Sequence, residues 1–165
     1  MLLTLSDEIS VRSRDGDERT IPATGLLAGP FETTLAPTEL LTQVRIPSPT
    51  GPGGGTYLKL ERKVGDFATA AAAVQLTLGA GGEVTQVGIG LTAMGETPVK
   101  ATDAERFLKG KKTNGAAITE TSRRAAAATD PTADRRGAVE YKREMARVLT
   151  ERALRLAIQR AGGTV

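Results

Sequence analysis

The 165-residue sequence contains no cysteine, no histidine and no tryptophan. The first two absences exclude disulfides, zinc sites built on thiolate or imidazole, cysteine nucleophiles, and dyads that pair histidine with serine or cysteine. Carboxylates, lysines, tyrosines and hydroxyl groups remain as reactive side chains. No cluster of Asp or Glu has the spacing of a metal-binding loop, so neither a metal site nor a catalytic residue is predicted.

Aromatic residues and long apolar runs are also scarce. Aromatics make up 3% of the chain against 39% hydrophobic residues, so a closely packed core of Leu, Val, Ile and Ala is expected. No stretch approaches the roughly 18 apolar residues of a membrane-spanning helix. The start, MLLTLSDEIS, has too short an apolar run and no basic leader for a signal peptide. These features predict a cytoplasmic protein without a membrane span.

Neither sign of charge dominates, because 22 Lys and Arg stand against 19 Asp and Glu, a formal net charge of +3. The basic residues are interleaved with acidic ones and lack the neighbouring aromatics that stack on bases. A nucleic-acid partner is therefore not predicted. Arginines near the C-terminus, such as Arg147 and Arg155, are mixed with glutamates, which favours a solvated face or a subunit contact over an anion-binding site.

The first 47 residues are predicted to be β-rich. Ile9 and Val11 alternate with polar residues ahead of an Asp15-Gly16 hairpin signal, and a further strand follows at ELLTQVRIP. Two or three such strands do not form a stable sheet alone. Residues 1–47 are therefore interpreted as the end of something larger.

A linker is predicted at residues 48–56, SPTGPGGGT, where Pro and Gly are concentrated. A glycine-rich phosphate-binding loop follows a strand and opens a helix, whereas this segment follows a proline-rich run and precedes a strand. The context favours a linker over a phosphate site, and the main domain is predicted to cover residues 57–165.

Residues 57–165 change from strand periodicity to helix periodicity. Alternating residues predict a strand at TYLKLERK and a hairpin across AAVQLTLGAGGEVTQVGIGLTAM. After Pro98 the pattern predicts helices over about 102–110, 115–128 and 137–161. Strands followed by helices indicate an α+β fold, an antiparallel three- to four-stranded sheet covered on one face by three helices.

Three further expectations concern packing. Ala71 and Ala73 are expected to face the helices, while the alternate alanines face the other way. A capping box at Thr102–Glu105 is predicted to start the first helix. Tyr141 lies on the apolar stripe of the last helix and is predicted to be a core residue.

The charged segment RKVGDF, residues 62–67, runs closely into four consecutive alanines and then into a strand. Alanine is depleted in strands, and such a local inconsistency often marks a functional surface. The candidate site residues are Lys59, Lys63, Asp66 and Phe67. In one interpretation they bind a flat, partly polar ligand, because Phe67 offers an aromatic face and Lys63 a cation. In the other, the segment is a salt-bridged strand end with Phe67 packed into the core.

Three segments carry a resemblance to a known family: YLKLERKVGDFATAAAAVQLTL, DRRGAVEYKREMARVLTERAL and GDERTIPATGLLAGPFETTLAPTELLTQVRIP. The first two resemble the C-terminal domain of the FAD-binding medium subunit of molybdenum hydroxylases, the carbon monoxide dehydrogenase and xanthine dehydrogenase family. The third is similar to the last strands of that subunit's second FAD-binding subdomain. The resemblance implies that residues 1–47 are a remnant of this subdomain and that residues 57–165 are the flavoprotein C-terminal α+β domain.

The resemblance implies an oxidoreductase subunit that works with FAD. Electrons would come from a molybdenum cofactor in a large subunit, pass through 2Fe–2S clusters of an iron–sulfur small subunit, and leave through the flavin to an external acceptor. In the family, the side chain at the position matched by Phe67 covers the isoalloxazine ring, so the resemblance implies that Phe67 covers it here and that Lys59 or Lys63 places a cation near it. Asp66 belongs to the same ring-contacting segment.

Two features depart from the family pattern. The glycine-rich loops that hold the FAD pyrophosphate lie upstream of the matched region and have no counterpart here, which predicts a truncated product or fragment that binds FAD weakly by itself. Ala138 stands where the family often has Ser, which weakens the cap of the last helix. Four residues match the family and are expected to be structural: Asp134, Arg136, Tyr141 and Lys142.

A different class of function stays open, a non-catalytic module that docks onto a partner subunit without flavin. An exposed alanine face, together with a missing upstream domain, would leave an apolar patch that promotes self-association into a homo-oligomer.

Overall fold

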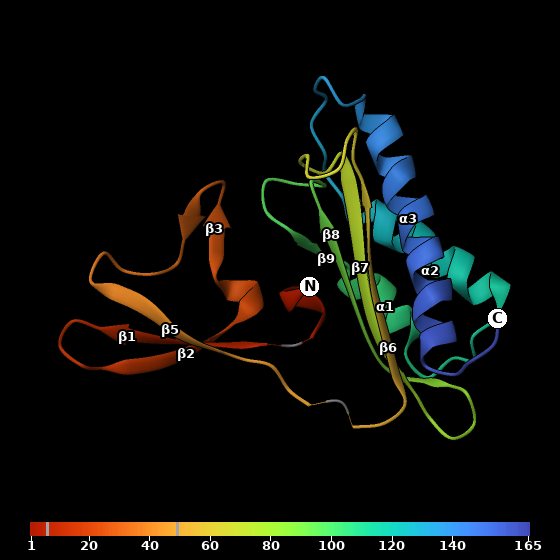
Figure 1. The fold of residues 1–165 in the computed structure, drawn as a ribbon, viewed down its shortest axis with the longest axis horizontal. Helices are drawn as coiled ribbons and strands as arrows, with labels where there is room; N and C mark the ends of the chain where they lie inside the picture. The colour runs from red at the N-terminus through yellow and green to blue at the C-terminus, as the bar shows by residue number, and fades with distance from the viewer. Residues whose placement is uncertain (6, 49) are drawn as a thin grey trace.

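The computed structural model describes residues 1–5, 7–48 and 50–165. The elements of this part of the chain are η1 (Leu2–Thr4), β1 (Glu8–Ser13), β2 (Glu18–Pro22), η2 (Ala23–Gly25), β3 (Leu27–Gly29), β4 (Glu32–Thr33), β5 (Glu39–Arg45), β6 (Gly53–Leu60), β7 (Ala70–Leu78), β8 (Val84–Thr92), β9 (Val99–Lys100), α1 (Thr102–Leu108), α2 (Gly115–Ala127) and α3 (Val139–Arg160). Figure 1 shows a sheet with the helices on one side and a smaller β-rich unit beside it.

Residues 50–165, all of which are described, form an α+β unit. Its sheet has the order β6-β7-β8-β9 with every neighbouring pair antiparallel, and three helices cover one face. The predicted fold class is confirmed. In the N-terminal unit β1 pairs with β2 through the predicted hairpin and with β5 on its other side, in the order β2-β1-β5.

The core lies between this sheet and the helices. Ala70, Ala72 and Val74 of β7 belong to the same buried cluster as Leu154 and Ile158 of α3. The alanines that face the helices are therefore Ala70 and Ala72, one position away from the prediction. Because side chains alternate between the two faces of a strand, an error of one residue reverses the whole assignment.

The opposite face of β7 is covered as well, so the expected exposed alanine face does not exist. All four residues from Ala70 to Ala73 are at most 2% exposed. The η1 turn lies against this face, where a Cβ atom added to Gly88 would come within 2.7 Å of the Thr4 Cα. The Lys100 ammonium also holds η1 by donating to the Leu3 carbonyl at 2.6 Å.

The glycine run of the predicted linker is partly a strand, because β6 begins at Gly53. Gly54 faces α3 so closely that an added Cβ would lie 2.7 Å from the Ala161 backbone nitrogen and closer still to the Ala157 carbonyl oxygen. Glycine here permits the close approach of strand and helix rather than flexibility. The division of the chain at residues 48–56 stays a prediction.

Two expectations for the helices are wrong. Tyr141 is 46% exposed, because the buried side of α3 is rotated away from it. That side is formed by Lys142, Ala146, Leu149, Thr150, Ala153, Leu154, Ala157 and Ile158. The capping box does not form either, since Ala101 is the N-cap of α1 and the Glu105 carboxylate instead accepts from the Ile89 N–H of β8 at 2.7 Å.

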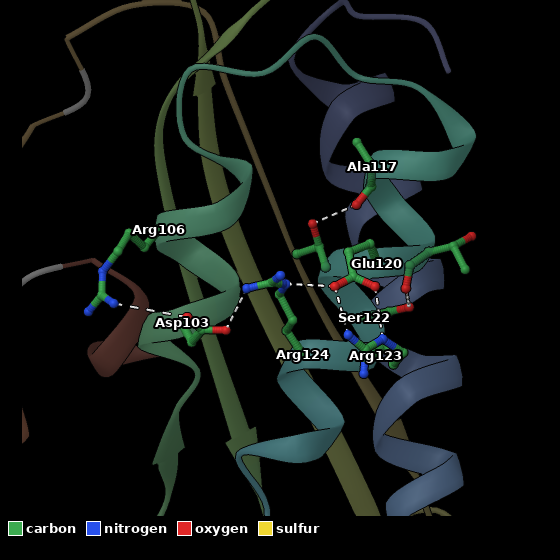
Figure 2. Close-up of polar contacts among 9 residues, drawn as sticks. Asp103, Arg106, Ala117, Glu120, Ser122, Arg123 and Arg124 are labelled. Carbon is green, nitrogen blue, oxygen red and sulfur yellow. Dashed lines mark hydrogen bonds and ion pairs between the residues drawn. The ribbon is translucent and has the colours of Figure 1, made fainter.

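Ion pairs join α1 to α2 on the outer surface. Arg124 donates to Asp103 of α1 at 2.9 Å and to Glu120 on its own helix at 2.8 Å, and Arg123 reaches the same glutamate at 2.8 Å (Figure 2). The Arg124 guanidinium also lies 4.4 Å from the centre of the Phe107 ring. These contacts account for the charged residues of α2 without a ligand.

Candidate functional site

The candidate site lies in the connection between β6 and β7. The Asp66 N–H donates to the Lys63 carbonyl at 3.0 Å, which closes a tight turn. Gly65 within it has φ +85°, a backbone conformation that residues other than glycine rarely adopt. The Thr69 N–H donates to the Leu60 carbonyl at 2.8 Å and closes the base of the connection. We call residues 61–69 the β6–β7 turn.

Asp66 is the centre of the contacts within this turn. Its carboxylate accepts from the Phe67 N–H at 2.8 Å and from Arg62 Nε at 3.3 Å, and its side chain is only 12% exposed. Its backbone carbonyl accepts from the Lys59 ammonium at 3.1 Å. The Phe67 N–H, followed by Arg62, holds the pKa of Asp66 below its usual value. The carboxylate is thus ionised and engaged within the protein.

Phe67 projects away from the protein. The residue is 83% exposed, and Val64 at the tip of the turn is 97% exposed. The interpretation that placed Phe67 in the core is wrong, whereas the ion pairs that it assumed at the strand end are present. A nearly bare aromatic ring on a hydrogen-bonded turn is an available stacking surface for a planar ligand.

The two candidate lysines differ in their availability. The Lys59 ammonium forms an ion pair with the Glu61 carboxylate at 2.5 Å, and the nearby carboxylate raises the pKa of Lys59. Lys63 is exposed and, within the described part of the chain, forms no ion pair or side-chain hydrogen bond. Lys59 therefore braces the turn, while Lys63 is the cation that a ligand could reach.

Arg136 also reaches this site, from the segment between α2 and α3. Its Nη2 lies 3.5 Å from Asp66 Oδ1. Sequence reasoning treated Arg136 as structural and did not connect it with the turn, because the two are distant in sequence. The sequence feature that could have drawn attention to Arg136 is the segment DRRGAVEY, which contains it and resembles the family.

The described residues contain no group of three or more Asp and Glu that could hold a metal ion. Among the helices described, none is long and apolar enough to cross a membrane. For FAD, the turn offers an aromatic face and a cation to the ring system, so these residues fit the ring. They do not supply the glycine-rich loops that a pyrophosphate group needs.

Comparison with solved structures places this architecture among dehydrogenase subunits. Carbon monoxide dehydrogenase from Hydrogenophaga pseudoflava matches with a TM-score of 0.91 at 34% identity, over 96% of this chain and 55% of that chain. Among curated sequences, the carbon monoxide dehydrogenase medium chain of Afipia carboxidovorans is 42% identical over 87% of this chain and 49% of its own length. The medium chain from Hydrogenophaga pseudoflava is 34% identical over 84% of this chain and 48% of its own.

The class defined by the fold and these relatives is the medium-subunit flavoprotein of molybdenum hydroxylases. Within it, this chain belongs to the CO dehydrogenase flavoprotein C-terminal domain family, whose model matches residues 55–157. The chain spans about half the length of the curated relatives that it matches.

Proposed function

We propose that this chain forms part of the flavoprotein subunit of a molybdenum-containing hydroxylase or dehydrogenase, and that its β6–β7 turn contacts the isoalloxazine ring of FAD. The observation that carries the proposal is the 83% exposure of Phe67 on a turn that Asp66 holds by several contacts. FAD, when bound, supplies a ring system that can accept and pass on electrons.

The residues of the turn divide into two roles. Phe67 stacks on the ring and keeps water from that face, and Lys63 offers positive charge where the ring gains electron density. Asp66 and Lys59 act on the turn itself, because the carboxylate and the ammonium are already bound to groups of the protein. They determine where Phe67 and Lys63 lie.

We further infer that the complete FAD site needs chain that lies outside these 165 residues, because the pyrophosphate loops have no counterpart here. An iron–sulfur small subunit and a molybdenum-containing large subunit are the proposed partners, and electrons pass from them through the flavin to an acceptor. The medium chains among the relatives support this arrangement. Substrate choice then rests with the large subunit.

Flavin binding can be tested on a fusion protein. In it, the part of the Afipia carboxidovorans medium chain that precedes its match to this chain is joined to residues 1–165. We expect the purified fusion to show visible flavin absorbance. Phe67→Ala should weaken FAD binding about 10-fold, because aromatic stacking contributes about 1.5 kcal/mol. Phe31→Ala is the matched control, since Phe31 is also fully exposed but lies in the N-terminal unit. Equal FAD affinity of the Phe67→Ala and unchanged fusions would contradict the stacking role.

A second candidate function is a docking module without flavin. Edge strand β5 favours it, because Leu40 and Leu41 are 73% and 41% exposed there, and Ile46 just beyond it is 54% exposed. Exposed apolar residues on an edge strand suit contact with another protein segment. A fusion that folds but takes up no flavin would favour this function over the first.

A further inference from the structure

We propose that Arg136, in the segment between α2 and α3, is a positioning residue, a strut that fixes the β6–β7 turn so that Phe67 is oriented before the flavin arrives. This inference rests on the proposed function, because it assigns a role toward the ring. It adds to the site a residue from a distant segment, which contacts Asp66 rather than Phe67.

One oxygen atom connects the strut to Phe67. Asp66 Oδ1 lies 3.5 Å from Arg136 Nη2 and accepts the Phe67 N–H at 2.8 Å. The position of this oxygen therefore depends on the guanidinium on one side and determines the backbone of Phe67 on the other. The contact with Phe67 is a hydrogen bond to a charged acceptor, which is stronger than a neutral one, and the contact with Arg136 is an ion pair.

The other end of the strut is anchored on α3. Lys142 is 4% exposed, and its ammonium donates to the Thr132 carbonyl at 2.7 Å and pairs with Asp134 Oδ1 at 2.9 Å. The same Asp134 oxygen accepts the Arg136 N–H at 2.8 Å. Asp134 and Gly137 close the segment further through two backbone hydrogen bonds of 3.1 and 3.2 Å. Arg136 thus extends from a segment held by the first turn of a long helix.

Arg62 cannot perform this role, although it also pairs with Asp66. It belongs to the same turn and its side chain is 68% exposed, so it moves with the turn, and solvent weakens an exposed pair of this kind. The Arg136 side chain is 27% exposed and comes from a different element. Its guanidinium lies between two carboxylates, with Nη2 3.5 Å from Asp66 Oδ1 and Nη1 3.9 Å from Asp134 Oδ2, so it connects the turn to the segment before α3.

Phe67 needs such a constraint because it is exposed. A residue that is 83% exposed gains little orientation from packing, so the direction of its side chain follows the backbone of the turn. If the turn were loose, binding of the ring would have to order it, and that entropy cost would lower affinity. The strut removes part of this cost in advance.

The first test needs no flavin. Amide hydrogen exchange is measured by NMR on the 165-residue chain, comparing Arg136→Gln with Arg135→Gln, an exposed neighbour that forms no ion pair within the described residues. We expect Arg136→Gln to speed exchange of the Phe67 amide about 5-fold and to leave Val74 in the core strand unchanged. Arg136→Lys, which keeps the charge, should restore part of the protection, and Arg135→Gln should have no effect.

The second test places the same variants in the fusion and measures FAD affinity and the visible circular dichroism of the flavin. We expect Arg136→Gln to weaken FAD binding about 5-fold and to change the flavin signal, with partial rescue by Arg136→Lys. Unchanged Phe67 exchange, an equal rise at Val74, or unchanged FAD affinity would each overturn the positioning role. An unmodified fusion without flavin overturns the proposed function and the role toward the ring together, whatever the exchange rates.

Discussion

Replacing Gly54 by alanine should separate α3 from the sheet. The added Cβ would lie 2.7 Å from the Ala161 nitrogen, 3.0 Å from the Ala157 carbonyl carbon and closer still to the Ala157 oxygen. These are backbone atoms of the last turn of α3, so no side-chain rotation can relieve the clash. The end of the helix has to move away by about 1 Å, which forfeits a quarter to a half of the dispersion energy across the gap.

The size of this effect follows from the nature of the obstacle. Overpacking of a core typically costs about 1–3 kcal/mol, and a rigid backbone obstacle places Gly54→Ala near the upper end, at about 3 kcal/mol. For 165 residues the entropy of unfolding is about 0.35 kcal/mol per kelvin, so Tm should fall by about 9 °C.

Gly55→Ala provides the matched control because Gly55 is the next residue and faces the other side of β6. Its added Cβ would meet the end of the Gln75 side chain, with Cδ 3.1 Å away, and this flexible group can turn aside. The cost should stay below about 1 kcal/mol, or about 3 °C in Tm. Both variants lose the same chain flexibility in the unfolded state, so that contribution cancels between them.

Thermal and urea unfolding followed by far-ultraviolet circular dichroism measures both variants. A similar Tm for Gly54→Ala and Gly55→Ala would refute the argument, because it would show that the contact of Gly54 with the α3 backbone costs no more than the contact of Gly55 with a movable side chain. A larger loss for Gly55→Ala would refute it as well.

Two further predictions concern a cap and acid stability. Ala138 is the N-cap of α3, with extended backbone (φ −70°, ψ 162°) and no side-chain cap hydrogen bond. Ala138→Ser should stabilise the protein by about 1 kcal/mol and raise Tm by about 3 °C, and an unchanged Tm would contradict this. Hydrogen bonds from arginine lower the pKa of Glu39 and Glu120 from 4.5 to about 2. Because the folded pKa is the lower one, this stability is complete above about pH 4.5 and is lost as the pH falls toward 2. The double variant Glu39→Gln, Glu120→Gln should therefore show a weaker dependence of unfolding on acid, and an equally steep dependence would disprove the assignment.

The fold class was predictable because periodicity is a local property of the chain. The hairpin at residues 72–94 and the helices after Pro98 appear close to their predicted positions. The faces of β7 could have been assigned from the same pattern, because Val74, Leu76 and Leu78 are apolar whereas Gln75 and Thr77 are polar, and Ala70 and Ala72 share the apolar face. The four identical alanines carry no such signal by themselves, so an assignment made from Ala70 to Ala73 alone went wrong by one residue.

The candidate site was found in part. Charged residues next to an aromatic, ahead of four alanines, drew attention to Lys63, Asp66 and Phe67. The same pattern could not decide whether Phe67 is buried, because burial depends on which distant segments cover the turn. It also could not show that the Lys59 ammonium forms an ion pair with the Glu61 carboxylate.

The sequence by itself determined which chemistry is available and which elements form, because composition and local periodicity depend only on near neighbours along the chain. It excluded thiol and imidazole chemistry and marked the turn that carries Phe67. Tertiary structure decided that Phe67 stays exposed, that Arg136 meets Asp66, and that Gly54 lies against α3. Each of these depends on segments that are far apart in sequence, and only packing of the helices on the sheet brings them together.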